Sequence, residues 1–158
     1  VIVFSSDNYQ TGGGFEVCYD DVSPAPTVTF APTPAFNILV STQSQLQTAL
    51  NSNECTSSEA PCEIGVVNDV GLSETLYILD SVALGSAGPD KMRLHGGGST
   101  RILDVFPGAT LDMSRMILQN GYSLAYAGAI YIYYGGIVTM LYCEFHENYA
   151  SLGGAIWA

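Results

Sequence analysis

A repeat of about 27 residues constrains the fold of this chain more than any other feature of its sequence. Residues 110–132 and 138–158 align with one another, so that Phe145 takes the position that Leu118 holds one period earlier. Each copy consists of short apolar runs that end at Gly, Asn, Asp or Pro, and none of these runs is long enough for a crossover helix. A period of this length, filled only with short strands and turns, is typical of a solenoid.

The repeat also predicts which side chains stack inside the coil. Residues one period apart lie above one another in a parallel sheet, and neighbours along a strand point to opposite sides. Ile102, Ile130 and Ile156 follow one another at intervals of one period, so these three are expected in one interior ladder. A second interior ladder is expected to hold Leu94, Leu118 and Phe145, with Tyr131, Tyr133 and Glu144 pointing outward.

The chain divides into three segments by composition. Residues 1–22 contain two apolar runs separated by a polar, glycine-rich stretch, which predicts extended strands in a hairpin with a long loop. Residues 23–36 contain four prolines among threonines and alanines, a composition that favours an extended linker. Residues 37–158 are expected to form the solenoid domain with an N-terminal cap.

One short helix is expected near the start of this domain. Leu46, Ala49 and Leu50 recur at helical spacing, which gives one apolar face. Thr42, followed three residues later by Gln45, fits a capping box. The helix and the loop after it are therefore expected to cap the first coil.

The repeated phrases resemble those of a known family of surface proteins. An F-x-x-N motif begins at Phe145 and is followed by Gly-Gly-Ala-Ile, and one period earlier Leu118 leads a weaker copy. This pattern resembles the repeats of the polymorphic outer membrane proteins. It implies their fold, an all-β, right-handed, single-stranded parallel β-helix of the pectin-lyase-like class. The motif residues are Asn120, Gly128, Ala129, Ile130, Phe145, Asn148, Gly153, Gly154, Ala155 and Ile156.

These motif residues have an architectural explanation. Asn120 and Asn148 are expected where the chain turns, because Asn tolerates the left-handed backbone conformation. Gly128 and Gly154 are expected where neighbouring coils approach closely at a corner. At the other end of the chain, residues 1–22 resemble the closing strands of a CUB-like β-sandwich, over that stretch alone.

The cysteines favour an oxidising compartment. Cys55 and Cys62 bracket a short polar loop, and we expect a disulfide between them. Cys18 has no evident partner, whereas Cys143 alternates with apolar residues and is expected to be a small buried side chain. There is no CxxC pair and neither histidine has ligand spacing to a cysteine, so neither a metal site nor another cofactor is expected.

The charge and hydropathy of the chain exclude some partners. Fifteen acidic and four basic side chains give a net charge of -11, which repels phosphate backbones and anionic lipid. The most apolar stretch, residues 125–141, is interrupted by glycines and falls short of the roughly 20 residues that cross a bilayer. We expect a secreted or cell-surface protein that binds no nucleic acid and has no membrane span, and a chain that is part of a longer protein.

Three classes of function are compatible with these features. The first is an extracellular structural protein, a subunit of a self-assembling cell-surface filament or matrix. The alternatives are a glycan-binding adhesin module and a polysaccharide lyase or hydrolase, and the Ser and Thr residues of the linker also suit O-linked glycans. The enzyme would need clustered carboxylates with basic partners on one outer face. The candidates for that face are Asp90, Lys91, Arg93, His95, Arg101, Asp104, Asp112 and Arg115, but the galacturonase signatures are absent and no catalytic residue is assigned.

The structural hypothesis predicts head-to-tail assembly. The apolar runs of residues 1–22 have no core of their own, and the last coil of a solenoid presents unpaired strand edges. We expect the N-terminal strands to dock on a neighbouring copy, which gives a filament or another homo-oligomer. The residues expected at this contact are Val1, Ile2, Val3, Phe4, Phe15, Val17, Ile156 and Trp157.

Overall fold

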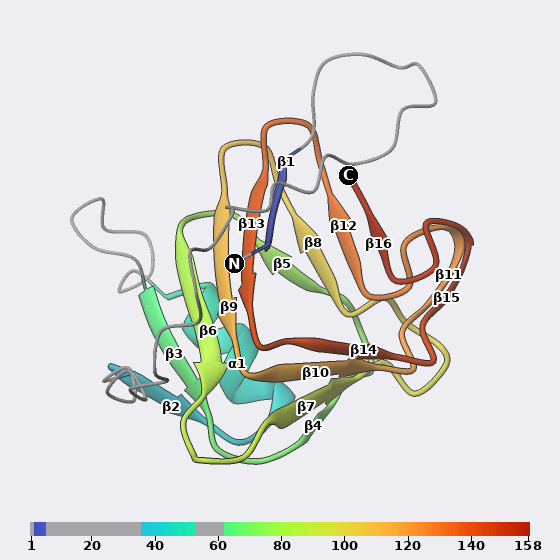
Figure 1. Cartoon of the computed structure of the whole chain (residues 1–158). Helices are drawn as coiled ribbons and strands as arrows, with labels where there is room; N and C mark the ends of the chain where they lie inside the picture. Colours follow the sequence, from blue (N-terminus) through green and yellow to red (C-terminus); the bar gives the residue numbers. More distant parts are fainter. Residues whose placement is uncertain (1, 6–35, 53–61) are drawn as a thin grey trace, which may run out of the picture.

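The chain folds into a parallel β-solenoid of about four turns, as the repeat predicts. The computed structural model describes residues 2–5, with backbone alone, together with residues 36–52 and 62–158. Figure 1 shows the coils stacked along one axis, with the short helix at the end where the described body begins. No helix in this part of the chain is long and apolar enough to cross a membrane.

Each coil contributes one strand to each wall of the solenoid. Before the first coil come β1 (Ile2–Ser5), β2 (Ile38–Val40) and the helix α1 (Gln43–Leu50). The first coil holds β3 (Cys62–Val66), β4 (Val70–Gly71) and β5 (Leu76–Ile78), and the second holds β6 (Val82–Ser86), β7 (Met92–His95) and β8 (Leu103–Val105). The third holds β9 (Thr110–Ser114), β10 (Met116–Gln119), β11 (Tyr122–Tyr126) and β12 (Ile130–Ile132). The fourth holds β13 (Ile137–Leu141), β14 (Glu144–His146), β15 (Tyr149–Leu152) and β16 (Ile156–Trp157).

Three sheets form the walls, and a fourth, shorter sheet extends one corner. Sheet A has the order β1-β13-β9-β6-β3-β2, sheet B the order β14-β10-β7-β4, and sheet C the order β16-β12-β8-β5. Sheet D contains β11 and β15 and adds to the third and fourth coils. In the described part of the chain, all strand pairs are parallel except β1 with β13, which is antiparallel.

The interior ladders follow the repeat, with one correction. Leu118 pairs with Leu94 on one side and with Phe145 on the other, as expected. Ile130 pairs with Ile156 as expected, but its partner in the second coil is Leu103 and not Ile102. Ile102 lies at the bend before β8 and is fully buried as well, so hydrophobicity alone does not distinguish these two neighbours.

Corners of the coil recur with the same period as the strands. Left-handed backbone at Arg115 and Asn120 is repeated one period later at Tyr142 and Glu147. Asn120 has φ 53°, which confirms its predicted place in a turn. The prediction for Asn148 is wrong in detail, because the left-handed residue of the fourth coil is Glu147, with φ 52°.

The helix α1 forms as the capping signal predicts. The Oγ1 atom of Thr42 accepts a hydrogen bond from the backbone N–H of Gln45. The Gln45 side chain accepts from the backbone N–H of Ser41 in place of the expected Thr42. Leu46, together with Ala49 and Leu50, is buried against the first coil, so the helix covers the end of the core.

The core is a stack of aliphatic side chains. In sheet A the inward residues Ile64, Leu84 and Met113 pair in succession, and each exposes 1% or less of its surface. A Leu or Ile side chain that is buried to this extent stabilises the fold by about 1.5 to 3 kcal/mol. Because every coil adds one layer, the outer faces of the three walls are rigid platforms for surface side chains.

Candidate functional site

The N-terminal strand lies on the last coil of its own chain. Strand β1 pairs antiparallel with β13, with Ile2 opposite Met140 and Ser5 opposite Ile137. The second apolar run of the expected hairpin lies outside the described residues, so the hairpin stays a prediction. Of the residues predicted for an assembly contact, Val1, Phe15 and Val17 lie outside the described residues.

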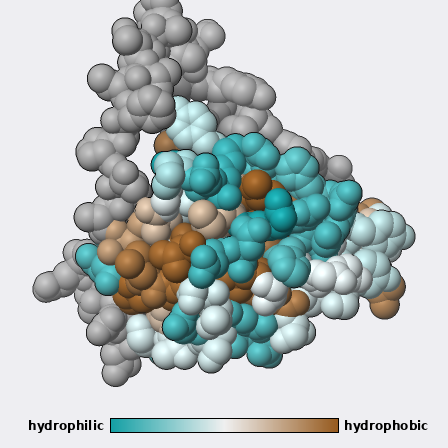
Figure 2. Space-filling view, turned by 90° about the horizontal axis from the view of Figure 1, so that it is seen from below, coloured by the Kyte–Doolittle hydropathy of each residue, from teal (hydrophilic) through white to brown (hydrophobic). Residues whose placement is uncertain are grey.

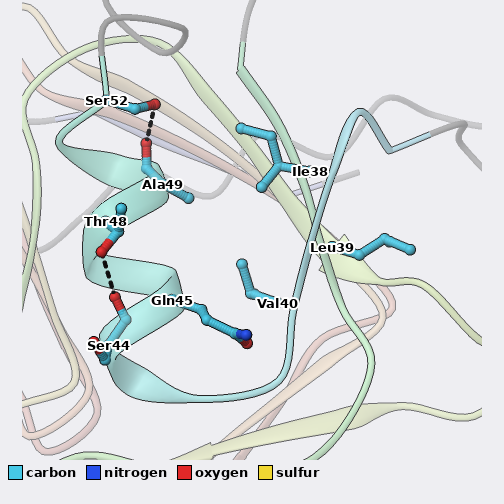
Figure 3. Close-up of a pocket in the computed structure, with 8 residues that line it drawn as sticks. All are labelled: Ile38, Leu39, Val40, Ser44, Gln45, Thr48, Ala49 and Ser52. Atoms are coloured by element: carbon cyan, nitrogen blue, oxygen red, sulfur yellow. Dashed lines mark hydrogen bonds between the residues drawn. The ribbon is translucent and has the colours of Figure 1, made fainter.

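The opposite edge of sheet A borders a groove. Strand β2 pairs with β3, and a cavity of about 610 Å³ lies between β2 and α1. Figure 3 shows Val40 pointing toward the helix and Leu39 pointing away from it. The Thr48 and Ser52 hydroxyls at its rim donate to backbone carbonyls of α1, at 2.8 Å each, so they are already engaged.

The charged residues considered for an enzyme do not gather on one face. Arg93 lies on β7 of sheet B, Asp104 on β8 of sheet C and Asp112 on β9 of sheet A. Beside sheet B, Arg93 forms an ion pair with Asp69 at 3.6 Å, and Lys91 forms an ion pair with Glu144. The view from below shows hydrophilic side chains over much of the face and an apolar area beside them (Figure 2). The expected single outer face is therefore wrong, because successive strands of one coil belong to different walls.

Residues 96–100, with the sequence GGGST, form a turn after β7. Gly97 and Gly98 have φ values of 60° and 70°, which glycine adopts without strain. The N–H of Gly98 donates to the carbonyl of Asn120 in the next coil at 2.7 Å. The three glycines thus serve the stacking of coils.

Arg101 and Asp104 form a shielded ion pair on sheet C. The Nη1 and Oδ1 atoms are 2.7 Å apart, and the side chains expose 18% and 8% of their surface. Burial raises the pKa of Asp104, and the hydrogen bond and charge of Arg101 offset part of that rise. Arg101 also donates to the carbonyls of Ala127 and Tyr126 and to the Ser123 hydroxyl, so its guanidinium joins the second coil to the third.

A continuous chain of aromatic ring contacts crosses the outer side of sheet C and reaches β11 of sheet D. We call it the aromatic track and define it by Tyr77, Phe106, Tyr133, Tyr131, Tyr126 and Trp157. Adjacent ring centroids in this order are 5.8, 4.7, 4.5, 5.9 and 4.8 Å apart. These distances lie in the range in which aromatic pairs attract one another.

The spacing of aromatic residues in the sequence indicates part of the aromatic track, which the interior ladders do not reveal. The repeat predicts Tyr131 and Tyr133 as outward residues but does not by itself link Tyr77 and Trp157 to them. Tyr77 and Tyr131 both pair with Asp104 in adjacent strands, and Trp157 pairs with Tyr131. A search for outward aromatic residues one or two periods apart would have revealed this part of the track.

The predicted motif residues act as parts of the coil. The side chain of Asn148 accepts from the N–H of Gly121 at 2.8 Å and donates to the carbonyl of Leu118 at 2.9 Å. A Cβ atom on Gly128 would lie 2.7 Å from the backbone nitrogen of Tyr149 in the fourth coil, which confirms a close approach of coils there. At Gly154 the backbone is left-handed, with φ 45°, but a Cβ atom would meet nothing within 4 Å. The reason for glycine at this position is therefore conformation and not space.

The last strand is less exposed than expected for an open end. Ile156 and Trp157 are half-buried, and Ile156 pairs with Ile130. The Trp157 ring packs against Tyr126 within the aromatic track. The Trp157 side chain therefore belongs to the outer face of sheet C within its own chain.

The cysteines differ in state. Cys143 is a free, half-buried thiol whose pKa is raised by burial. Cys62 is buried at the first position of β3 and is not a free thiol. Cys55 and Cys18 lie outside the described residues, so the Cys55–Cys62 disulfide stays a prediction. In the described part of the chain no three His, Cys, Asp or Glu side chains are grouped so as to hold a metal ion.

Comparison with protein-family models, curated proteins and solved structures finds no match to this chain.

Proposed function

We propose that this chain is an extracellular structural module, related to the polymorphic outer membrane proteins, that assembles with further copies into a cell-surface filament or matrix by exchanging strand β1. The pairing of β1 with β13 carries the proposal. The four residues of β1 join a sheet whose strand at that edge begins more than a hundred residues later in the sequence. Because β1 and β13 are so far apart in the sequence, β1 of a second copy is equally able to pair with β13.

The physical basis is that exchange preserves the contact. A β1 strand from a neighbour would satisfy the same backbone groups of β13 as the strand of the same chain does, so the closed and exchanged forms differ mainly in chain entropy and concentration. The segment between β1 and the body comprises residues 6–35, and its Pro-rich part has a composition typical of spacers that extend by about 3.1 Å per residue. If each copy places its β1 strand on the β13 strand of the next copy, the result is a linear chain of subunits.

The experiment uses a cysteine pair across the β1–β13 contact. Val3 lies opposite Thr139, and directly opposed residues of an antiparallel pair have Cα atoms about 4.5 to 5.5 Å apart, within the range of a disulfide. Val3→Cys and Thr139→Cys are placed in separate copies that also carry Cys143→Ser, which removes the free thiol of the described residues, and Cys18→Ser. The two proteins are mixed, incubated and oxidised.

The proposal expects a covalent dimer from the mixture and larger species when both cysteines are in every copy. A matched control moves one cysteine to the next strand of the sheet, with Val3→Cys mixed with Asp112→Cys on β9, and should give no dimer. If the mixture stays monomeric while the double variant closes within one chain, β1 belongs to its own body and the assembly proposal is wrong. Light scattering of the unmodified chain over a range of concentrations gives an independent readout.

A further inference from the structure

The outer face of sheet C has the features of a binding site for an extended polymer. The rings of the aromatic track come from successive coils, which are stacked at about 4.8 Å per strand. They form a chain of ring contacts that reaches all four coils, and three of the rings, those of Tyr126, Tyr131 and Tyr133, come from the third coil. Tyr77 exposes 52% of its surface and Tyr126 exposes 39%. The other four rings are half-buried. A group of neighbouring large rings that reaches the surface is a candidate interaction site.

The track is held in place from below by the Arg101–Asp104 pair. The guanidinium carbon of Arg101 lies 4.9 Å from the centre of the Tyr131 ring, which is cation–π distance. The same guanidinium donates one hydrogen bond to Asp104 and another to the carbonyl of Tyr126. The backbone that carries Tyr126 and the ring of Tyr131 are therefore fixed before any ligand arrives, which lowers the entropy cost of binding.

The charge of the site selects its ligand. The chain carries a net charge of -11, so a polyanion would be repelled. Arg101 is the cation that contacts the track among the described residues, and its donors already bond Asp104, Ser123 and backbone carbonyls. A carboxylate or sulfate ligand would have to displace these bonds. A ligand without charge fits the track better.

We propose that the aromatic track binds an uncharged, linear β-linked polysaccharide that lies across the coils on the outer face of sheet C. Pyranose rings have apolar C–H faces that pack on aromatic rings, and their hydroxyls bond to the phenol oxygens of the tyrosines. An extended sugar chain can contact rings of several coils, because the ring contacts reach from Tyr77 in the first coil to Trp157 in the fourth. This site lies on sheet C, whereas strand exchange uses sheet A, so either proposal can fail without the other.

The experiment titrates the full chain with soluble β-1,4-linked glucan and mannan oligosaccharides and follows tryptophan emission. Trp157 is the one tryptophan in the sequence and part of the track, so its fluorescence reports binding at this face. Affinity is confirmed by calorimetry. Oligogalacturonate of the same length serves as the charged comparison.

Tyr77→Ala tests the track at a residue whose ring contact is with Phe106 alone among the described residues, and Tyr126→Ala is the second variant. Each should weaken binding about tenfold or more, while Tyr77→Phe keeps the ring and most of the affinity. Tyr149→Ala is the matched control, an exposed tyrosine that stacks on Tyr122 in sheet D, and should bind as the wild type does.

Four results would overturn the proposal. The first is that neither uncharged oligosaccharide binds at millimolar concentration, and the second is that oligogalacturonate binds equally or more tightly. The third is that Tyr77→Ala and Tyr126→Ala bind with unchanged affinity. The fourth is that a peptide of residues 23–36 binds in preference to the oligosaccharides. The last result would assign the track to Pro-rich segments, which also dock on aromatic surfaces.

Discussion

Arg101 and Asp104, three residues apart, make the most buried ion pair of the described residues, and the pair joins two coils and supports a row of aromatic rings. Its two members are not equivalent. Besides its bond to Asp104, Arg101 makes three hydrogen bonds to the third coil, whereas the Asp104 carboxylate is bonded by Arg101 and loses water on burial. Loss of the arginine should therefore cost more than neutralising the aspartate.

The first prediction measures this asymmetry. Arg101→Met should lower the free energy of unfolding by about 3 kcal/mol, because a buried carboxylate is left without its partner. Asp104→Asn should cost about 1 kcal/mol or less, since the amide oxygen still accepts from Arg101 and no charge is desolvated. Urea unfolding at neutral pH gives both values. Lys91→Gln, which removes an exposed pair, serves as control and should change little. Equal losses for the two sheet C variants would contradict the asymmetry.

The second prediction concerns pH. Burial raises the pKa of Asp104 above its ordinary value of 3.8, so the folded chain holds this proton at a pH at which the unfolded chain has released it. The stabilisation from this group is therefore fully present below the unfolded pKa and is lost as the pH rises through the folded pKa. Glu144 acts in the opposite direction, because hydrogen bonding to Lys91 lowers its pKa.

The difference in unfolding free energy between the wild type and Asp104→Asn isolates the first effect. The pH is varied from about 3.5 to about 6.5 in half-unit steps, which covers the range above the ordinary pKa of an aspartate. As the pH rises, the wild type should lose stability relative to the variant. Glu144 is present in both proteins and cancels. A difference that is flat with pH, or one that favours the wild type as pH rises, would show that Arg101 outweighs burial.

The period of the sequence is enough to predict the solenoid and much of its register. Leu94, Leu118 and Phe145 can be aligned because inward positions must be apolar in every coil. The helix α1 can be predicted because its capping signal and apolar face are local. Ile102 and Leu103 cannot be separated, since both are buried and differ only in which one begins the strand.

The repeat does not fully predict two features of the structure. The pairing of β1 with β13 joins segments that share no period, and a strand at an edge has no pattern that names its partner. The aromatic track lies on outward positions, where the core imposes no residue type. Spacings of one or two periods link Tyr77, Tyr131 and Trp157 in the sequence, but Tyr126 has no such spacing to another aromatic residue, and its contact with Trp157 is found only from the structure.

The third prediction tests the close contact of coils at Gly128. A methyl group there would lie 2.6 Å from the Gly121 oxygen and 2.7 Å from the Tyr149 nitrogen, both of them backbone atoms that a rotamer change cannot move. Gly128→Ala should lower the free energy of unfolding by about 1 to 3 kcal/mol, the usual cost of overpacking. Gly88→Ala is the matched control, because the nearest atom to its added carbon is 3.9 Å away. Thermal unfolding compares the two, and equal midpoints would mean that the corner relaxes freely.

The fourth prediction concerns the asparagine that joins the third and fourth coils. The Asn148 side chain accepts from one backbone group of the third coil and donates to another, so it needs both an oxygen and an N–H. Asn148→Asp keeps the acceptor but sets a carboxylate oxygen against the Leu118 carbonyl, which should cost about 1 to 3 kcal/mol at neutral pH. At acid pH the protonated carboxyl can donate again, so the loss relative to wild type should shrink as the pH falls through the pKa of the new aspartate. Asn120→Asp is the matched control, since no side-chain hydrogen bond from Asn120 to another described residue is seen and its turn backbone suits Asp as well. Urea unfolding at several pH values checks both variants, and a loss for Asn148→Asp that does not vary with pH would show that the donated hydrogen bond is not what holds the coils together.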